Sequence, residues 1–432
     1  MMNKTLIASL LVLASQLVMA DDLLEVYKMA VEKDPVLREA AAVRESRRES
    51  RPLALSQLLP NVSVSGDMNY NNTKTHSLGD ESFGTSSLGI NLLQPIYRRD
   101  RFIRLEQADW QLELADAEYR AKEQDLMLRV ATAYFNILSA QEGVTFVQAD
   151  KKAIARQLEQ AKQRFEVGLI AITGVHEAQA RYDQAVTDEI VAQNELDNAW
   201  EDLRQILGVR PEKLAQLKAK LALEPPVPAA IDEWSAFGLE NNPAVKVASD
   251  ATQIAQREIE VQNSGHYPSL DLVGRYSTFG TNQDNRFDVD NGNVGLQLNI
   301  PLYAGGGVTA ATRQARADLI AAQERLDQAR RSTDKAVRNA YRGVQASISA
   351  VRALEAAIVS TKSALEATTA GFEVGTRTLV DVLNSQRDYY RSRRDYARAR
   401  YVYLVNMLRL RQAAGVLAVE DIEKVNTLLV EK

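Results

Sequence analysis

The side chains that most often carry out chemistry in proteins are few in this chain, and their spacing does not assemble a site. There is no cysteine, which excludes a disulfide framework, a thiolate metal site and a cysteine nucleophile. The histidines His76, His176 and His266 are scattered and lack the spacing of metal ligands. The glycine run at 305–307 lacks the Gly-Lys-Ser/Thr ending of a phosphate-binding loop and indicates a turn. The sequence therefore predicts no enzyme, no cofactor and no metal site.

The remaining candidate residues cluster in a segment that occurs twice. Residues 371–384 read GFEVGTRTLVDVLN, and residues 164–177 read RFEVGLIAITGVHE. Each copy interrupts a long proline-free helical pattern, and its central glycine permits a positive φ between two helices. We therefore predict two equivalent helix-to-helix turns, and name residues 164–177 the first tip and residues 371–384 the second tip.

Taken by themselves, the polar residues of the second tip have local roles. Thr378 and Asp381 have the spacing of a capping box that starts a helix. Arg377 is expected to be a solvated charge on a surface turn, which is the usual location of arginine.

The repeat extends along the whole chain. Further motif pairs occur in the same order at nearly the same offset, which is the mark of a duplicated plan: Asp34-Pro35 with Asn242-Pro243, Leu59-Pro60 with Tyr267-Pro268, Gln94-Pro95-Ile96-Tyr97 with Ile300-Pro301-Leu302-Tyr303, and Leu207-Gly208 with Ala414-Gly415. We expect two structural repeats, at 21–222 and 223–432, the second ending in a tail.

Composition and the N-terminus place the protein outside the cytoplasm. The 432 residues carry a net charge of −5, which gives no electrostatic case for binding nucleic acid. Residues 1–20 combine a lysine, a short apolar core and a Val-Met-Ala ending, which predicts a cleaved signal peptide. The apolar run is too short for a membrane anchor.

Each repeat contains two segments in which apolar and polar residues alternate strictly, which predicts strands with one apolar face. Each is roughly 10 residues long, enough to cross a bilayer when tilted. Polar loops are expected at 71–86 and 280–293. The predicted strands are 61–70, 87–94, 269–278 and 294–300.

Four long segments instead show apolar residues at helical spacing. The first carries two apolar seams side by side, which predicts helix neighbours on both sides, as in the wall of a helical barrel. The predicted helices are 98–167, 175–207, 309–374 and 379–414.

Four strands cannot close a membrane barrel, since the smallest need about eight, and lipid does not tolerate an open sheet edge. If the strands cross a membrane, two, three or four copies must share one barrel whose polar face surrounds a water-filled pore. The alternative is a soluble periplasmic coiled-coil protein that binds partners and never enters lipid.

The two tip motifs, the segments HYPSLDL and IPLYAGG, and the repeated halves together resemble the TolC family of outer membrane efflux proteins. The resemblance covers nearly the whole mature chain. It implies a mainly α protein with a membrane β-barrel: a homotrimer whose chains share a 12-strand barrel in outer-membrane lipid and a 12-helix periplasmic barrel. An equatorial domain would contain residues 22–33, the linker and the tail.

The same resemblance implies a function. The protein would be a passive exit duct in the outer membrane of a Gram-negative bacterium, with a large periplasmic part. It would serve efflux of small molecules, type I protein secretion, or both, gated at the periplasmic tips. Its partners would be a periplasmic adaptor protein and an inner-membrane RND, ABC or MFS transporter.

In the family, two aspartates one helical turn apart supply an acidic ring at the narrow mouth. The matching positions are Asp381 and Asn384. Three copies would therefore present a single ring of Asp381 carboxylates, which would attract cations. The absence of the second aspartate weakens this ring.

The family also closes its mouth with a Tyr and an Arg of the second tip, bonded to a Thr-Asp pair and a Gln near the first. The matching residues are Phe372, Arg377, Thr173, Gly174 and Gln157. Because the Tyr hydroxyl and the Asp carboxylate are both missing, we expect Arg377 and packing to hold the closed state.

The resemblance finally assigns contact with adaptor hairpins to the turns of the two tips. The matching residues are Val167, Gly168 and Leu169 in the first tip, and Val374, Gly375 and Thr376 in the second.

Overall fold

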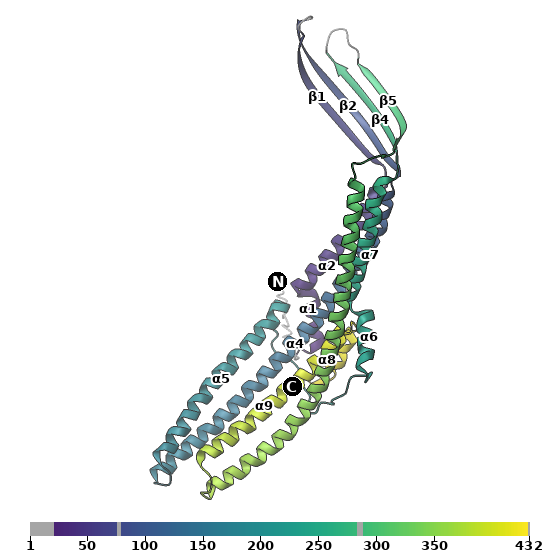
Figure 1. Ribbon diagram of the computed structural model, residues 1–432. Helices are drawn as coiled ribbons and strands as arrows, with labels where there is room; N and C mark the ends of the chain where they lie inside the picture. The colour runs from purple at the N-terminus through teal and green to yellow at the C-terminus, as the bar shows by residue number, and fades with distance from the viewer. Residues whose placement is uncertain (1–20, 76–78, 283–287, 431–432) are drawn as a thin grey trace, which may run out of the picture. The chain divides into compact units, whose positions relative to one another are not determined.

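The computed structural model describes residues 21–75, 79–282 and 288–430 (Figure 1). The predicted signal peptide and His76 lie outside the described residues. The chain forms two compact units. Unit 1 comprises the chain up to Pro35, Gln124–Trp234 and the chain from Val337; unit 2 comprises Val36–Glu123 and Ser235–Ala336. Both sequence repeats contribute segments to both units, so the repeats are not two separate compact bodies.

Unit 2 contains a four-stranded antiparallel sheet with the strand order β1-β2-β4-β5. Its two edges are therefore β1 and β5. The strands are β1 (Asn61–Thr75), β2 (Gly79–Tyr97), β4 (Ser269–Thr281) and β5 (Val289–Asn299).

These strands are longer than the sequence indicates. The prediction of a loop at 71–86 is wrong over most of its length, because β1 continues to Thr75 and β2 begins at Gly79. The loop predicted at 280–293 is likewise shortened by β5, which begins at Val289. The extra residues are Asn, Thr, Ser, Gly and charged types that read as loop, yet the cross-strand register pairs them, as in Thr73 with Glu81.

The register confirms the predicted apolar face. Val64 pairs with Ile90, Ile90 with Tyr276, and Leu272 with Leu296, so apolar side chains of all four strands lie on one face. This face is not covered by the chain's own residues: Val64 is 67% exposed and Met68 88% exposed. The opposite face carries mainly serine and asparagine.

The sheet is joined to the helices of unit 2 by an ion pair. Arg98, which follows β2, donates from Nε to Asp271 Oδ1 over 3.0 Å and from Nη2 to Oδ2 over 2.5 Å. Asp271 is buried at the start of β4. The shorter helices here are α2 (Pro35–Arg48), α3 (Ser50–Ser56), α7 (Pro243–Asn263) and the 3₁₀ turn η1 (Ser264–His266). Helices α2 and α3 are separated at Glu49, and α6 spans Ile231–Asn241.

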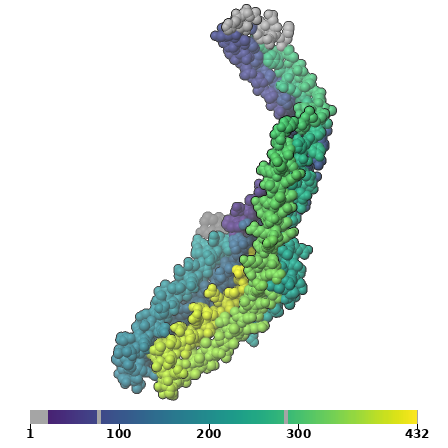
Figure 2. All heavy atoms as spheres, in the orientation of Figure 1, coloured from purple at the N-terminus to yellow at the C-terminus, as the bar shows by residue number. Residues whose placement is uncertain are grey.

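The four long helices end close to where the periodicity ends. Within unit 1 they lie in the order α5, α4, α9, α8, with both tips at the same end (Figures 1 and 2). Contacts join each neighbouring pair, such as Lys151 to Glu189 and Gln386 to Asp150. Of the helices described, none is both long enough and apolar enough to cross a membrane. Their bounds are α4 (Arg99–Glu166), α5 (Ile172–Leu207), α8 (Gly307–Glu373) and α9 (Leu379–Ala413).

Small elements from both ends of the chain and from the linker pack together in unit 1, as expected for 22–33, the linker and the tail. Asn426 donates to Asp22 Oδ2 over 2.7 Å, and the buried Tyr134 hydroxyl donates to the Ala215 carbonyl over 2.7 Å. The elements are α1 (Leu23–Lys33), β3 (Gln216–Leu217), α10 (Val419–Asn426) and β6 (Leu429–Val430).

A buried carboxylate fixes the C-terminal end of α1 to α4. Asp34 is 1% exposed, and Arg129 donates to both of its oxygens, over 3.2 and 2.9 Å. Removing one partner of such a pair leaves an uncompensated buried charge, which is strongly destabilising.

We therefore expect Arg129→Met to lower the free energy of unfolding by about 3 kcal/mol, measured by thermal or denaturant unfolding. Arg409→Met, which removes an exposed arginine of α9, is the matched control. Equal stability of the two variants would contradict the role given to Arg129.

Candidate gate at the helix tips

The two tips have the same backbone. Gly168 and Gly375 adopt positive φ values of 76° and 80°. In the first tip the Gly168 amide donates to Phe165 and the Leu169 amide to Arg164. In the second tip the Gly375 amide donates to Phe372 and the Thr376 amide to Gly371. This paired hydrogen bonding caps a helix C-terminus with glycine. The prediction of two equivalent turns is confirmed.

A small apolar core joins the tips within one chain. It contains residues of α4, α5 and α9, with Phe372 packed against it, so the start of α9 lies on the α4/α5 pair. The buried members are Ile154, Leu158, Ala161, Ala178, Ala185, Leu379 and Leu383.

Asp381 makes the predicted capping box at the start of α9. The backbone amide and the hydroxyl of Thr378 donate to Asp381 Oδ2 over 3.0 and 2.9 Å, and the Asp381 amide donates back to the hydroxyl over 3.2 Å. These bonds, the backbone one first, hold the pKa of Asp381 below its ordinary 3.8. A lowered pKa stabilises the folded turn above pH 3.8, and that contribution is lost as the pH falls through the folded pKa.

Asn384 has a partner that the sequence did not indicate. Arg181 of α5 donates from Nη2 to Asn384 Oδ1 over 3.0 Å. Two residues further on, Gln386 donates to Asp150 Oδ1 of α4 over 2.8 Å. Burial raises the pKa of Asp150, and the Gln386 bond lowers it in part. Thus α9 is bonded to both helices of the first tip just above its capping box.

The other predicted closure residues lie in the tips or, for Gln157, on α4 just before the first tip, and they do not form one network. The Arg164 guanidinium lies over the Phe372 ring, 4.6 Å from the ring centroid. In the described part of the chain, the side chains of Arg377, Thr173 and Gln157 make no polar contact with one another. Gly174 donates its amide to the Ala171 carbonyl over 3.0 Å, at the first turn of α5.

The turn residues assigned to adaptor contact lie at the surface. Val167 is 70% exposed, Leu169 is 73% exposed and Val374 is 75% exposed. Such apolar exposure beside polar residues is the composition of a protein contact surface. Elsewhere, His176 and His266 are exposed, and no cluster of candidate metal ligands occurs within 21–75, 79–282 and 288–430.

Comparison with known proteins decides the family. The model of the outer membrane efflux protein family matches residues 26–209 and 238–416. The chain belongs to the outer membrane efflux protein family. It is 40% identical over 324 residues to the outer membrane protein TolC of Vibrio cholerae, an alignment that spans 74% of this chain and 73% of that protein.

One further relative and one solved structure extend the comparison for this outer membrane efflux protein. It is 30% identical to the alkaline protease secretion protein AprF of Pseudomonas aeruginosa, over 68% of this chain and 63% of AprF. A solved structure of CusC superposes with a TM-score of 0.82, covering 92% of this chain and 93% of that one at 18% identity. The fold is therefore TolC-like, and the protein is a channel protein of the Gram-negative outer membrane rather than an enzyme.

The capping box can be tested directly. Thr378→Ala should raise the local opening of the first turn of α9 by roughly two- to thirtyfold, the effect of losing an N-cap. Hydrogen exchange of the Val382 and Leu383 amides reports this opening. Thr187→Ala on α5, whose hydroxyl bonds only within its own helix, is the control. Unchanged exchange in Thr378→Ala would contradict the capping role.

Proposed function

We propose that this outer membrane efflux protein is a trimeric channel-tunnel, a passive exit duct gated at its periplasmic tips. The observation that carries the proposal is the sheet of unit 2. Its exposed apolar face suits lipid, while its serine- and asparagine-rich face suits water. A soluble periplasmic coiled-coil protein would leave this face in water, which is unfavourable for so large an apolar surface.

The sheet edges support sharing of one barrel between copies. β1 and β5 each leave a row of unpaired backbone groups, which lipid does not tolerate. Joining β5 of one copy to β1 of the next satisfies them. Three copies give about twelve strands, well above the minimum for closure.

The outer helices of the row also expose apolar side chains. α5 and α8 are the outer members of the four-helix row in unit 1, and each exposes an apolar residue: Ile190 on α5 and Val359 on α8. We propose that α5 of one copy packs against α8 of the next, so that the rows join into a helical barrel above the tips.

At the mouth of this barrel we propose that Asp381 forms a single acidic ring and that Arg377 helps to close it. Within its own chain the Arg377 charge helps to lower the pKa of Asp381, and we propose that its closing contacts are with neighbouring copies. Asn384 is engaged by Arg181 and adds no charge to the ring.

We also propose that the exposed tip turns dock a periplasmic adaptor, and that an inner-membrane transporter supplies the energy. The sequence carries no nucleotide-binding motif of its own. The cargo is small molecules, secreted proteins, or both. The likeness to AprF, named for protease secretion, supports the secretion role.

Purified protein should run as heat-modifiable trimers from the outer-membrane fraction and conduct in planar lipid bilayers. Arg377→Ser should raise the single-channel conductance, because it removes a closing contact at the mouth. The control is Arg409→Ser, the same change on the exposed side of α9 away from the tip. A soluble monomer without conductance would refute the proposed channel. Trimers whose single-channel conductance is unchanged by Arg377→Ser would refute only the proposed gate.

Docking is tested with Val167→Asp combined with Val374→Asp. Charging the centre of an apolar contact should abolish in-cell crosslinking to periplasmic and inner-membrane proteins, while trimers and conductance stay unchanged. Val43→Asp, an exposed valine of α2, is the matched control. Crosslinking that survives the double substitution would place docking elsewhere.

A further inference from the structure

A groove runs along one face of unit 1, above the tips. Its volume is 820 Å³. The floor is α4, where Gly143 leaves open space and the half-buried Phe146 and Val147 line the groove. One wall is α5 and the other is α9. Nothing in the proposed gate uses this groove, yet charged side chains line both walls.

The two walls are in a fixed register. Arg181 of α5 and Asn384 of α9 are in contact at the tip end, and both helices run away from the tips. One heptad further along each helix stand Asp188 and Arg391, and a second heptad further stand Glu195 and Arg398. All four line the groove. Heptad spacing keeps successive residues on the seam between two helices.

The first pair is closed and the other two are open. In the described structure no ion pair crosses the groove from Asp188 or Glu195. Each open pair nevertheless has an acid on α5 and an arginine on α9. The charges are therefore complementary at both levels, in the same order along the helices.

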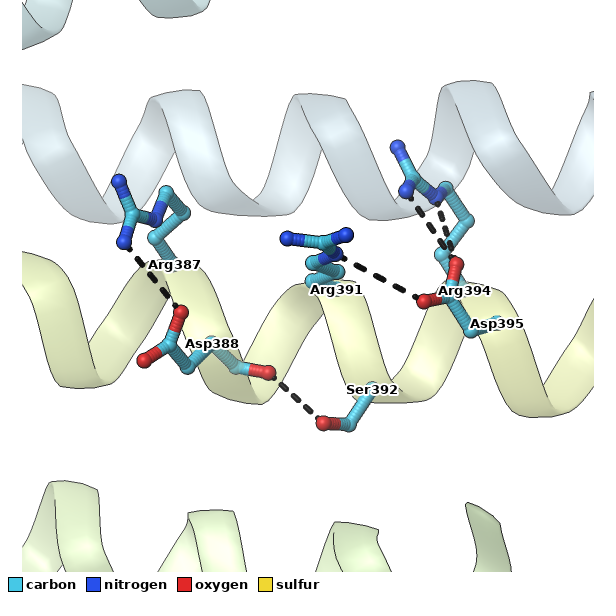
Figure 3. A network of polar contacts seen from close by, with 6 residues as sticks. All are labelled: Arg387, Asp388, Arg391, Ser392, Arg394 and Asp395. Carbon is cyan, nitrogen blue, oxygen red and sulfur yellow. Dashed lines mark hydrogen bonds and ion pairs between the residues drawn. The ribbon is translucent and has the colours of Figure 1, made fainter.

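Three arginines of α9, Arg387, Arg391 and Arg394, are paired with carboxylates of their own helix (Figure 3). Arg391 Nε lies 3.8 Å from Asp395 Oδ2, and Arg394 donates to Asp395 Oδ1 over 3.2 Å. Arg387 pairs with Asp388 at 3.5 Å. These exposed pairs are weak, so exchanging one for a pair across the groove costs little.

We infer that α5 and α9 carry a ladder of three residue pairs, which we call rungs. The first rung, Arg181–Asn384, is in contact in the structure. The other two rungs, Asp188–Arg391 and Glu195–Arg398, come into contact when the groove closes. Closure extends the contact of α9 with α5 from the tip over roughly 20 Å. This inference rests on the proposed gate, because it gives the chain a means of holding α9 on the α4/α5 pair when the mouth is shut.

The absence of native cysteine permits a clean reporter. Glu195→Cys with Arg398→Cys, in trimers in detergent, forms a disulfide only when the two backbones approach to within about 7 Å. We expect oxidative crosslinking in this pair. Arg181→Cys with Asn384→Cys is the positive control, because the native side chains are in contact; it is read with a bis-maleimide, since the arginine side chain spans more distance than a disulfide does. Glu195→Cys with Val405→Cys is one heptad out of register and should not crosslink.

In the cysteine reporter, the Asp188–Arg391 pair is still present and is expected to control the rate of disulfide formation. Arg391→Glu should slow crosslinking about two- to fivefold, the effect of one exposed ion pair on an equilibrium. Exchanging the charges, with Asp188→Lys and Arg391→Glu together, should restore it. Asp395→Asn should speed it by releasing Arg391, while Asp388→Asn, which releases Arg387, should not. Salt at 1 M should erase these differences, since screening there acts within about 3 Å.

The ladder would be overturned if the positive control crosslinks and the Glu195→Cys/Arg398→Cys reporter does not. It would also be overturned if Arg391→Glu leaves the crosslinking rate of the reporter unchanged. The link to the gate is read in Arg377→Ser trimers, where oxidising the reporter should return the raised conductance to the wild-type value. Crosslinking without that return would overturn the gating role of the ladder. If Arg377→Ser raises nothing before oxidation, the proposed gate fails while the ladder still stands on its crosslinking.

Discussion

Backbone hydrogen bonding at the sheet edges is the constraint on which the rest depends. The sheet ends at β1 on one side and β5 on the other, and each edge strand has peptide groups that water or another strand must pair. In lipid there is no water to do so. A sheet with an exposed apolar face and open edges is therefore stable in a bilayer only as part of a larger closed sheet. Oligomerisation follows from the same requirement as membrane insertion.

Duplication of the sequence supplies the strands and helices that such a shared sheet needs. Each repeat supplies one strand hairpin and one pair of long helices, and β2 of the first repeat pairs with β4 of the second. The polar anchor between Arg98 and Asp271 crosses from one repeat to the other at the base of the sheet. Contacts of this kind run between repeats, and both compact units accordingly contain segments of both halves.

Local periodicity in the sequence was enough to predict the sheet faces and the bounds of the four long helices. It failed where a distant partner decides the structure. Thr73 and Glu81 read as loop and become strand only because they face each other across a register that the inner residues establish. Arg181 and Asn384 lie far apart in sequence, and their contact depends on the offset between two helices that only packing sets. A heptad-spaced run of opposite charges on α5 and α9 was the available signal.

The three proposed rungs differ in charge along the helices, from a neutral acceptor at the tip to charged pairs farther away. At the tip, an amide oxygen accepts from Arg181, and a neutral acceptor keeps that hydrogen bond without adding charge beside Asp381. Two heptads of charged pairs follow, whose strength varies with screening and with competition from Asp395 on the same helix. A gate needs one contact that persists and others that can be exchanged at low cost. In the proposed gate, Asn384 thus keeps the contact that holds α9 in place separate from the Asp381 ring.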